Sequence, residues 1–247
     1  MFPYWGPLST YQLMATIAFT ASASYLYWAL SAIPSIRKRD LLLFLIGSYF
    51  VNKYGAALIP YLYRTTVEHW HGPYLWAGKH FYSAFLSIFF YGVAVAALLR
   101  WPVKKCIDHA AITTLIGSSI GRIGCFLNGC CRGKPCDLPW AVTFPDAPGM
   151  RVHPAQLYAV VVELLILWIL LRLIKRPRYD GQTFWTAVWL YSLYRTGIET
   201  VRANPVFLWG LTTFQVFSIL MLAVSSCVLF HHRARRSAQP LPPSRES

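Results

Sequence analysis

The chain has 247 residues, of which 56% are hydrophobic and only 13% are charged, against a usual charged share of about 25%. So much apolar surface excludes a disordered chain, and so few charges could not cover the surface of a soluble globule. The net charge of +14 comes from 23 Lys and Arg against 9 Asp and Glu. Such an excess suits nucleic acid, an anionic membrane surface or an anionic substrate, and the positions of the basic residues decide among them.

Seven apolar stretches are long enough to cross a bilayer as helices, which takes roughly 20 mostly apolar residues each. They cover residues 8–33, 41–63, 80–99, 107–128, 154–174, 182–200 and 211–230. No Lys or Arg precedes Arg37, so the first stretch lacks the basic region of a secretory signal peptide and is predicted to be a permanent span. The predicted fold is all-α, a polytopic membrane domain of seven transmembrane helices over residues 1–232.

Most basic residues follow the odd-numbered spans. They are Arg37, Lys38, Arg39, Arg100, Lys104, Lys105, Arg172, Lys175, Arg176, Arg178, Arg233, Arg235, Arg236 and Arg245. The positive-inside rule therefore places the N-terminus outside and the C-terminus in the cytoplasm, and no nucleic-acid partner is needed to explain the charge. Residues 233–247 are rich in Pro, Ser and Arg and are predicted to form a disordered cytoplasmic tail.

The segment 129–152 is rich in Pro and Gly, so we expect an ordered external loop between the fourth and fifth helices rather than a helix. Around it, Cys125, Cys130, Cys131 and Cys136 form a C-x4-C-C-x4-C pattern. No C-x2-C pair or histidine spacing accompanies them, so no metal site is predicted. A disulfide through Cys136 in an oxidising compartment stays open.

Span six ends in YSLYRTGIETVR, where Arg195, Glu199 and Arg202 recur at i, i+4 and i+7 on one helical face. One interpretation is an intrahelical ion pair at an interfacial helix end. The other is a polar strip facing a cavity, in which two arginines sharing one glutamate leave positive charge for a phosphate.

Span four ends in GSSIGRIGCFLNGCCRG, whose small residues favour close helix packing but do not explain Arg122. Arg122 either snorkels to the outer interface or is held ready for an anionic headgroup. We favour the second interpretation because Arg195 is expected at the same depth. For Lys53, outward snorkelling and a functional role are equally good interpretations. Glu163 has no assigned partner, and we make no functional prediction for it.

The motifs GRIGCFLNGCCRGKPCDLPWAVTFP and RVHPAQLY resemble the signature region of the bacterial prolipoprotein diacylglyceryl transferases, in the branch with a Cys-Cys pair in the signature. LSTYQLM at 8–14, GKHFYSAF at 78–85 and YRTGIETVR at 194–202 resemble further motifs of that family. The resemblance implies a multi-pass enzyme of the bacterial inner membrane. It would transfer the diacylglyceryl group of phosphatidylglycerol to the lipobox cysteine of prolipoproteins, forming a thioether and releasing glycerol phosphate without any metal or redox cofactor.

The resemblance also implies roles for individual residues. The implied catalytic residues are Arg122 and Arg195, which would clamp the phosphate and the leaving group. We add Tyr82 as a catalytic residue by hypothesis, expecting it to orient a group through its hydroxyl. Substrate-binding residues are implied as well: Tyr11 would lie beside the lipid headgroup, and Asn128, Gly129 and Gly133 would shape the loop entrance. His153 and Gln156 would position the loop or the substrate, and Glu199 would orient Arg195 or Arg202.

The chain departs from the family pattern at several positions. Cys125 and Cys130 stand at the signature asparagine and glutamate positions, and Tyr82 replaces a frequent histidine. Ala57 replaces a frequent second-span arginine, with Lys53 one turn earlier as its candidate replacement. Two alternatives therefore stay open: a related phosphatidylglycerol-dependent transferase with another acceptor, and a protein that binds or transports anionic lipids without catalysis.

Overall fold

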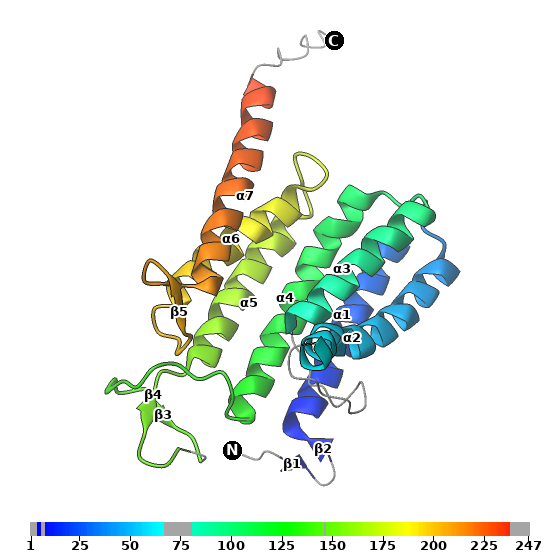
Figure 1. Ribbon diagram of the computed structural model, residues 1–247. Coiled ribbons are helices and arrows are strands. Elements are labelled where there is room, and N and C mark those ends of the chain that lie inside the picture. Colours follow the sequence, from blue (N-terminus) through cyan, green and yellow to red (C-terminus); the bar gives the residue numbers. More distant parts are fainter. Residues whose placement is uncertain (1–3, 6–7, 67–80, 146, 238–247) are drawn as a thin grey trace. The chain divides into compact units, whose positions relative to one another are not determined.

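The computed structural model describes residues 4–5, 8–66, 81–145 and 147–237 (Figure 1). This part of the chain forms seven α-helices, which are α1 Thr10–Ser31, α2 Lys38–Thr66, α3 Phe81–Leu98, α4 Val103–Leu127, α5 Ala155–Leu173, α6 Gln182–Ile198 and α7 Thr213–Ser237. Each helix coincides with one of the predicted apolar stretches. The chain is therefore mostly helical, as its composition predicts.

Short strands pair in three two-stranded antiparallel ribbons among the described residues. The pairs are β1 Tyr4–Trp5 with β2 Leu8–Ser9, β3 Val142–Thr143 with β4 Arg151–Val152, and β5 Val206–Leu208 with β6 Leu211–Thr212. The second ribbon lies in the Pro/Gly-rich segment between α4 and α5, and the third lies between α6 and α7. These ribbons shape the connections and add no sheet to the core.

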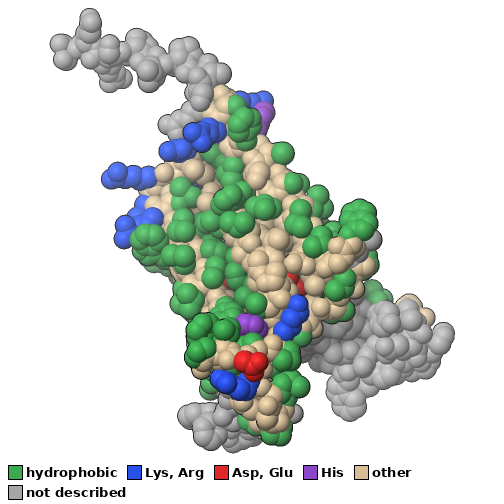
Figure 2. Space-filling view, turned by 90° about the vertical axis from the view of Figure 1, so that its left-hand side faces the viewer, with side chains coloured by type: hydrophobic (Ala, Val, Ile, Leu, Met, Phe, Trp, Pro, Cys, Tyr) green, Lys and Arg blue, Asp and Glu red, His purple; other side chains and the backbone are tan. Residues whose placement is uncertain are grey.

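Four helices are long and apolar enough to cross a bilayer: α1, α4, α5 and the Thr213–Arg235 part of α7. Apolar side chains are exposed on the surfaces of these helices. On α5, for example, Leu164, Leu165 and Trp168 are about half exposed. On the face shown in Figure 2, hydrophobic side chains cover the middle, and Lys and Arg gather at the end where α7 finishes. These features are typical of a multi-pass membrane protein. Spans by α2, α3 and α6 stay predictions.

The chain forms two compact units, residues 1–22 with 108–247 and residues 23–107. In the second unit Leu41 and Trp101 belong to a buried apolar cluster. The rings of Phe44 and Tyr91 stack beside it, with centroids 5.3 Å apart. Gly47 allows α2 and α3 to pack closely, because a Cβ there would collide with the ring of Tyr91.

In the first unit, glycines on α4 let it approach the start of α1. A Cβ on Gly117 would lie 2.8 Å from Ser22 Oγ, and one on Gly124 would lie 2.8 Å from Met14 Cβ. The Ser22 hydroxyl donates a hydrogen bond across the contact to the carbonyl of Thr113 at 3.1 Å. This is the small-residue packing expected of helices in a membrane, and it places the end of α4 beside Tyr11.

The first turn of α6 is capped by a carboxylate from α4. Asp108 Oδ2 accepts a hydrogen bond from the N–H of Gly181, and Oδ1 accepts one from the N–H of Phe184, both at 2.7 Å. Amide groups in the first turn of a helix lack intrahelical partners and favour negative charge. Asp108 therefore ties α4 to α6 at the end opposite to Arg122.

The helical part of the chain extends further at its C-terminal end than the sequence predicts. Helix α7 continues to Ser237, so residues 233–237 are helical although we expected them in the disordered tail. Ala and Arg are strong helix formers, so the helix can continue past its apolar part. The rest of the predicted tail, 238–247, lies outside the described residues.

Candidate functional site

The end of α6 carries a cluster of charged side chains around one carboxylate. Glu199 is fully buried, and its Oε1 lies 2.8 Å from Arg195 Nη2 and 3.4 Å from Arg202 Nε. Neither approach is aligned as a hydrogen bond. Helix α6 ends at Ile198, so Arg202 lies in the following turn and not on the continuous helical face that its spacing suggests. It reaches Glu199 because the chain turns back there.

The second oxygen of Glu199 is held by two hydrogen bonds. Asn204 Nδ2 donates to Oε2 at 2.7 Å, and the Thr212 hydroxyl donates to it at 2.9 Å. Thr212 is also the N-cap of α7, in a capping box whose other member is Gln215. The carboxylate thus has a fixed position, which in turn fixes both guanidinium groups. Arg195 also lies over the ring of Phe214 at 4.7 Å.

A second buried carboxylate brings Arg122 to the same region. Arg122 Nε on α4 lies 3.8 Å from Glu163 Oε1 on α5, and the Glu163 side chain is fully buried. Glu163 also interacts electrostatically with Arg195. Tyr194 on α6 interacts with Glu163 and with both arginines. Arg122 therefore lies beside Glu163, and Arg195 is near enough to act electrostatically on the same carboxylate, although the two arginines are far apart in the sequence.

The charges of this cluster do not balance. Three arginines, Arg122, Arg195 and Arg202, share two carboxylates, so the cluster has one positive charge in excess when both carboxylates are ionised. The predicted intrahelical pair between Arg195 and Glu199 is present, but it is one part of a larger network. Arg122 pairs with a buried carboxylate instead of snorkelling outward. An excess buried cation suits an anionic ligand such as a phosphodiester.

Sequence reasoning missed Glu163 and Tyr194 as members of this cluster. Glu163 lies near the middle of α5, where a single acidic residue has no partner within its own helix. Its partner is on α4, and nothing in the spacing of either segment indicates that contact. The one available signal was that Glu163 is an ionisable residue within an apolar stretch.

The end of α4 has the geometry of a Schellman motif. The N–H of Cys130 binds the carbonyl of Cys125, and the N–H of Gly129 binds that of Phe126, both at 3.1 Å. Gly129 takes the left-handed conformation that this motif requires, with φ +76°. Asn128 is exposed at the same turn. Asn128 and Gly129 thus end the helix and start the loop, and their part in a loop entrance for the substrate stays a prediction.

Gly133 connects the loop to the other cluster. It pairs with Arg202 in an isolated β-bridge, and its N–H binds the carbonyl of His153 at 3.0 Å. A Cβ at Gly133 would lie 2.7 Å from the carbonyl oxygen of Val201 and 2.6 Å from His153 Cβ. Only glycine fits this close approach of three chain segments. Residues before α5 and after α6 are therefore joined through Gly133.

His153 and Gln156 hold the loop from the start of α5. Gln156 is fully buried, and its Nε2 donates a hydrogen bond to the carbonyl of Cys130 at 2.6 Å. His153 Nδ1 lies 3.4 Å from the hydroxyl of Tyr158, which also accepts a hydrogen bond from Trp140 Nε1 at 2.7 Å. Both residues therefore contact the loop, and their proposed role in positioning the substrate stays a prediction.

Tyr11 and the cysteines lie at the same end of the first unit. Tyr11 is 47% exposed and interacts electrostatically with Arg122 and with the thiols of Cys125, Cys130 and Cys131. Hydrogen bonds from Cys125 and Cys130, together with the guanidinium groups of Arg202 and Arg122, lower the pKa of the Cys131 thiol. All six cysteines are free thiols, so the disulfide through Cys136 that the loop composition left open is not formed.

Two candidates belong to the other unit. Tyr82 lies in the first turn of α3, but its side chain is outside the described part of the structure. Lys53 is an exposed residue of α2, with its Nζ 5.9 Å from the centre of the Tyr54 ring. Their roles stay predictions.

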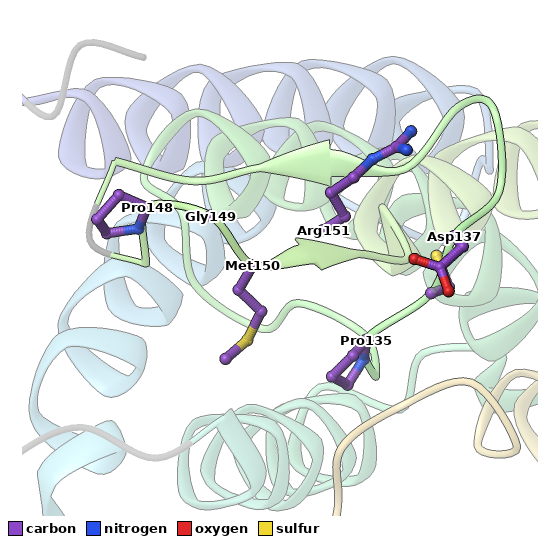
Figure 3. Close-up of a pocket in the computed structure, with 7 residues that line it drawn as sticks. Pro135, Asp137, Pro148, Gly149, Met150 and Arg151 are labelled. Atoms are coloured by element: carbon purple, nitrogen blue, oxygen red, sulfur yellow. The ribbon is translucent and has the colours of Figure 1, made fainter.

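The loop also contains a shallow hollow of about 580 Å³ (Figure 3). Its lining residues are Pro135, Cys136, Asp137, Pro148, Gly149, Met150 and Arg151. In the close-up, the side chains of Met150 and Arg151 point to opposite sides of the chain. Arg151 Nη2 donates a hydrogen bond to the carbonyl of Leu138, so it stabilises the loop itself. None of the clustered arginines lines this hollow.

Comparisons with known proteins agree with the motifs. The family model described as prolipoprotein diacylglyceryl transferase matches residues 3–231. A phosphatidylglycerol–prolipoprotein diacylglyceryl transferase of Dehalococcoides mccartyi strain BAV1 is 29% identical over 243 residues, which cover 93% of this chain and 90% of the relative. Relatives with the same name are 31% identical over 63% of each chain in Geobacter sulfurreducens and 39% identical over 53% of this chain and 52% of the relative in Methylococcus capsulatus.

Proposed function

Because the chain belongs to the prolipoprotein diacylglyceryl transferase family, we propose that it transfers the diacylglyceryl group of phosphatidylglycerol to the lipobox cysteine thiol of prolipoproteins. This is the first step of lipoprotein maturation. The observation that carries the proposal for this site is that Arg122 lies beside Glu163 while Arg195 acts electrostatically on the same carboxylate. A cluster with one excess positive charge is suited to the phosphodiester of the lipid headgroup.

The reaction follows from this electrostatic arrangement. The acceptor sulfur, after loss of its proton to solvent, attacks C3 of the glyceryl unit and forms a carbon–sulfur bond. The bond between C3 and the phosphate oxygen breaks, and its electron pair leaves with glycerol phosphate. Negative charge therefore increases on the departing phosphate. Fixed guanidinium groups in a site of low dielectric constant stabilise such developing charge without having to reorganise.

Supporting residues act through these arginines and the loop. Glu199 holds Arg195 and Arg202 in place through the contacts described above. Gln156 and Gly133 hold the loop that follows α4. Tyr11, which interacts electrostatically with Arg122, is proposed to lie beside the bound headgroup. Tyr82 is proposed to orient a reacting group through its hydroxyl. In this scheme the thiol proton of the acceptor cysteine passes to solvent, and no side chain is assigned as the general base.

The proposed location is the bacterial inner membrane, with all seven helices spanning it, the N-terminus outside and the C-terminus in the cytoplasm. The basic ends of α5 and α7 support this orientation through the positive-inside rule. Phosphatidylglycerol would then reach the site from the outer leaflet, and the precursor would present its cysteine on the same side. The loop between α4 and α5 would be external.

The test uses the purified chain, phosphatidylglycerol and a synthetic lipobox peptide. Mass spectrometry should show a gain of one diacylglyceryl group on the peptide cysteine. Arg122→Ala and Arg195→Ala should each lower kcat by at least about 100-fold, the loss seen when one donor to a developing anion is removed. The matched control is Arg172→Ala, which removes an exposed arginine at the end of α5.

The same assay separates the alternatives. Release of glycerol phosphate without a peptide product would indicate a transferase with another acceptor. Binding of phosphatidylglycerol with no release would indicate a lipid-binding or transport protein. Full activity in both arginine variants would reject the proposed mechanism.

A further inference from the structure

Three thiols converge where α4 ends. The Sγ atoms of Cys125, Cys130 and Cys131 all lie within 4.8 Å of one another. Cys125 is on the last turn of α4, and Cys130 and Cys131 follow Gly129 in the loop. The transfer mechanism uses none of these thiols, so their arrangement needs its own explanation.

The backbone brings the thiols together. The Schellman motif joins Cys130 to Cys125 through a backbone hydrogen bond, and this motif places side chains at these two positions in contact. Cys131 then adopts φ +61°, an uncommon and strained conformation for a residue with a Cβ. Gln156 fixes the same turn from α5 by its hydrogen bond to the Cys130 carbonyl. The arrangement is therefore built by two helices and by backbone strain at Cys131.

We propose that Cys125, Cys130 and Cys131 form a three-thiolate binding site for a soft monovalent cation of the Cu(I) type. Metal–thiolate bonds of about 2.3 Å in a trigonal plane place the sulfur atoms about 4.0 Å apart. The sulfur atoms need to approach one another by less than about 1 Å to reach this geometry, a change that rotation of the side chains can supply. Each bound thiol releases its proton to water.

The ligand set favours Cu(I) over zinc. Structural zinc takes four ligands, whereas no His, Asp or Glu joins the three thiols in the described part of the chain. Thiolates select soft ions such as Cu(I). Three thiolates around a monovalent ion also leave two negative charges, and Arg122 and Arg202 both interact with Cys131. These two guanidinium groups offset part of the negative charge of the complex.

This proposal departs from the expectation that the sequence contains no metal site. That expectation rested on the paired C-x2-C spacing of zinc sites, which a C-x4-C-C pattern does not match. Here a helix C-cap, rather than a knuckle, brings positions i and i+5 together. Cys136 belongs to the same sequence pattern but not to the group of three thiols. It therefore provides a matched control.

The test is a titration of the purified, reduced full-length chain with Cu(I) in competition with a Cu(I) chelator under anaerobic conditions. We expect one tightly bound Cu(I) per chain and a thiolate-to-copper charge-transfer band in the near ultraviolet. Cys125→Ser, Cys130→Ser and Cys131→Ser should each weaken binding at least tenfold. Cys136→Ser and Cys227→Ser should bind as the unmodified chain does.

X-ray absorption of the copper-loaded unmodified chain provides a readout that does not depend on variants folding. A first shell of three sulfur atoms supports the site. A shell of two sulfur atoms, loss of binding in Cys136→Ser, or absence of the charge-transfer band would overturn it. A disulfide between two of the three cysteines that persists after reduction and blocks copper would also overturn it. These measurements involve no lipid or peptide, so their outcome is independent of the proposed transfer reaction.

Discussion

Neutralising Glu199 should destabilise the protein because it leaves two buried cations without their shared partner. Glu199→Gln keeps the shape of the side chain and can keep the hydrogen bonds from Asn204 and Thr212 on one oxygen. The amide nitrogen would then replace Oε1, the oxygen that faces Arg195 and Arg202. The N–H groups of the introduced amide would then face the N–H groups of both guanidinium groups, so the attraction would be lost.

The magnitude follows from the distances. Opposite unit charges separated by 2.8 Å attract by about 6 kcal/mol at an effective dielectric constant of about 20. Desolvation offsets part of this attraction, and removing one partner of a buried pair typically costs about 3–5 kcal/mol. Because the Arg195 and Arg202 side chains each stay 11% exposed, we expect a loss near the lower end, about 3 kcal/mol.

The assay is thermal unfolding of the purified protein in detergent, followed by tryptophan fluorescence. A loss of about 3 kcal/mol should lower the apparent Tm by roughly 6–12 °C in a chain of this length. Asp137→Asn, which neutralises an exposed acidic residue, is the control and should leave Tm nearly unchanged. Adding Arg202→Gln to Glu199→Gln should restore part of the stability, because it removes one of the unpaired cations.

An unchanged Tm in Glu199→Gln would refute this reasoning, since it would mean that the buried network contributes nothing to stability. A lower Tm with no recovery in the double variant would show that the loss comes from hydrogen bonding and not from charge.

Two further substitutions test the local geometry. Gly133→Ala should lower the free energy of unfolding by about 1–3 kcal/mol, because the added Cβ would meet backbone oxygens at 2.7 and 2.9 Å. The control is Gly121→Ala, whose Cβ would meet nothing within 4 Å and which should be neutral or stabilising. Equal Tm values for the two variants would contradict the predicted clash. Asp108→Ala should lower the free energy of unfolding by about 1–2 kcal/mol, because it leaves the N–H groups of Gly181 and Phe184 without their cap. Faster amide hydrogen exchange confined to the start of α6 would confirm this cause, and unchanged exchange there would reject it.

The helices were predictable because their signals are local. A run of apolar residues of sufficient length is visible in any window of the chain, and each predicted stretch coincides with a helix of the structure. The extension of α7 to Ser237 was missed because apolar length was used as the criterion, although the basic residues there also favour a helix. Arg195 and Glu199 were paired correctly because an i, i+4 spacing fixes their distance within one helix.

The sequence by itself determined the class of protein, the positions of its helices and the membership of Arg122, Arg195 and Glu199 in recognisable motifs, since these depend on composition and on neighbours along the chain. Only the tertiary structure decided that Arg122 meets Glu163, that Arg195 acts electrostatically on that carboxylate, and that three thiols converge near Arg122. The physical reason is that these contacts join α4, α5, α6 and the loop. Their geometry depends on how whole helices pack, through contacts such as those of Gly124 and Gly133, and no spacing within one segment encodes it.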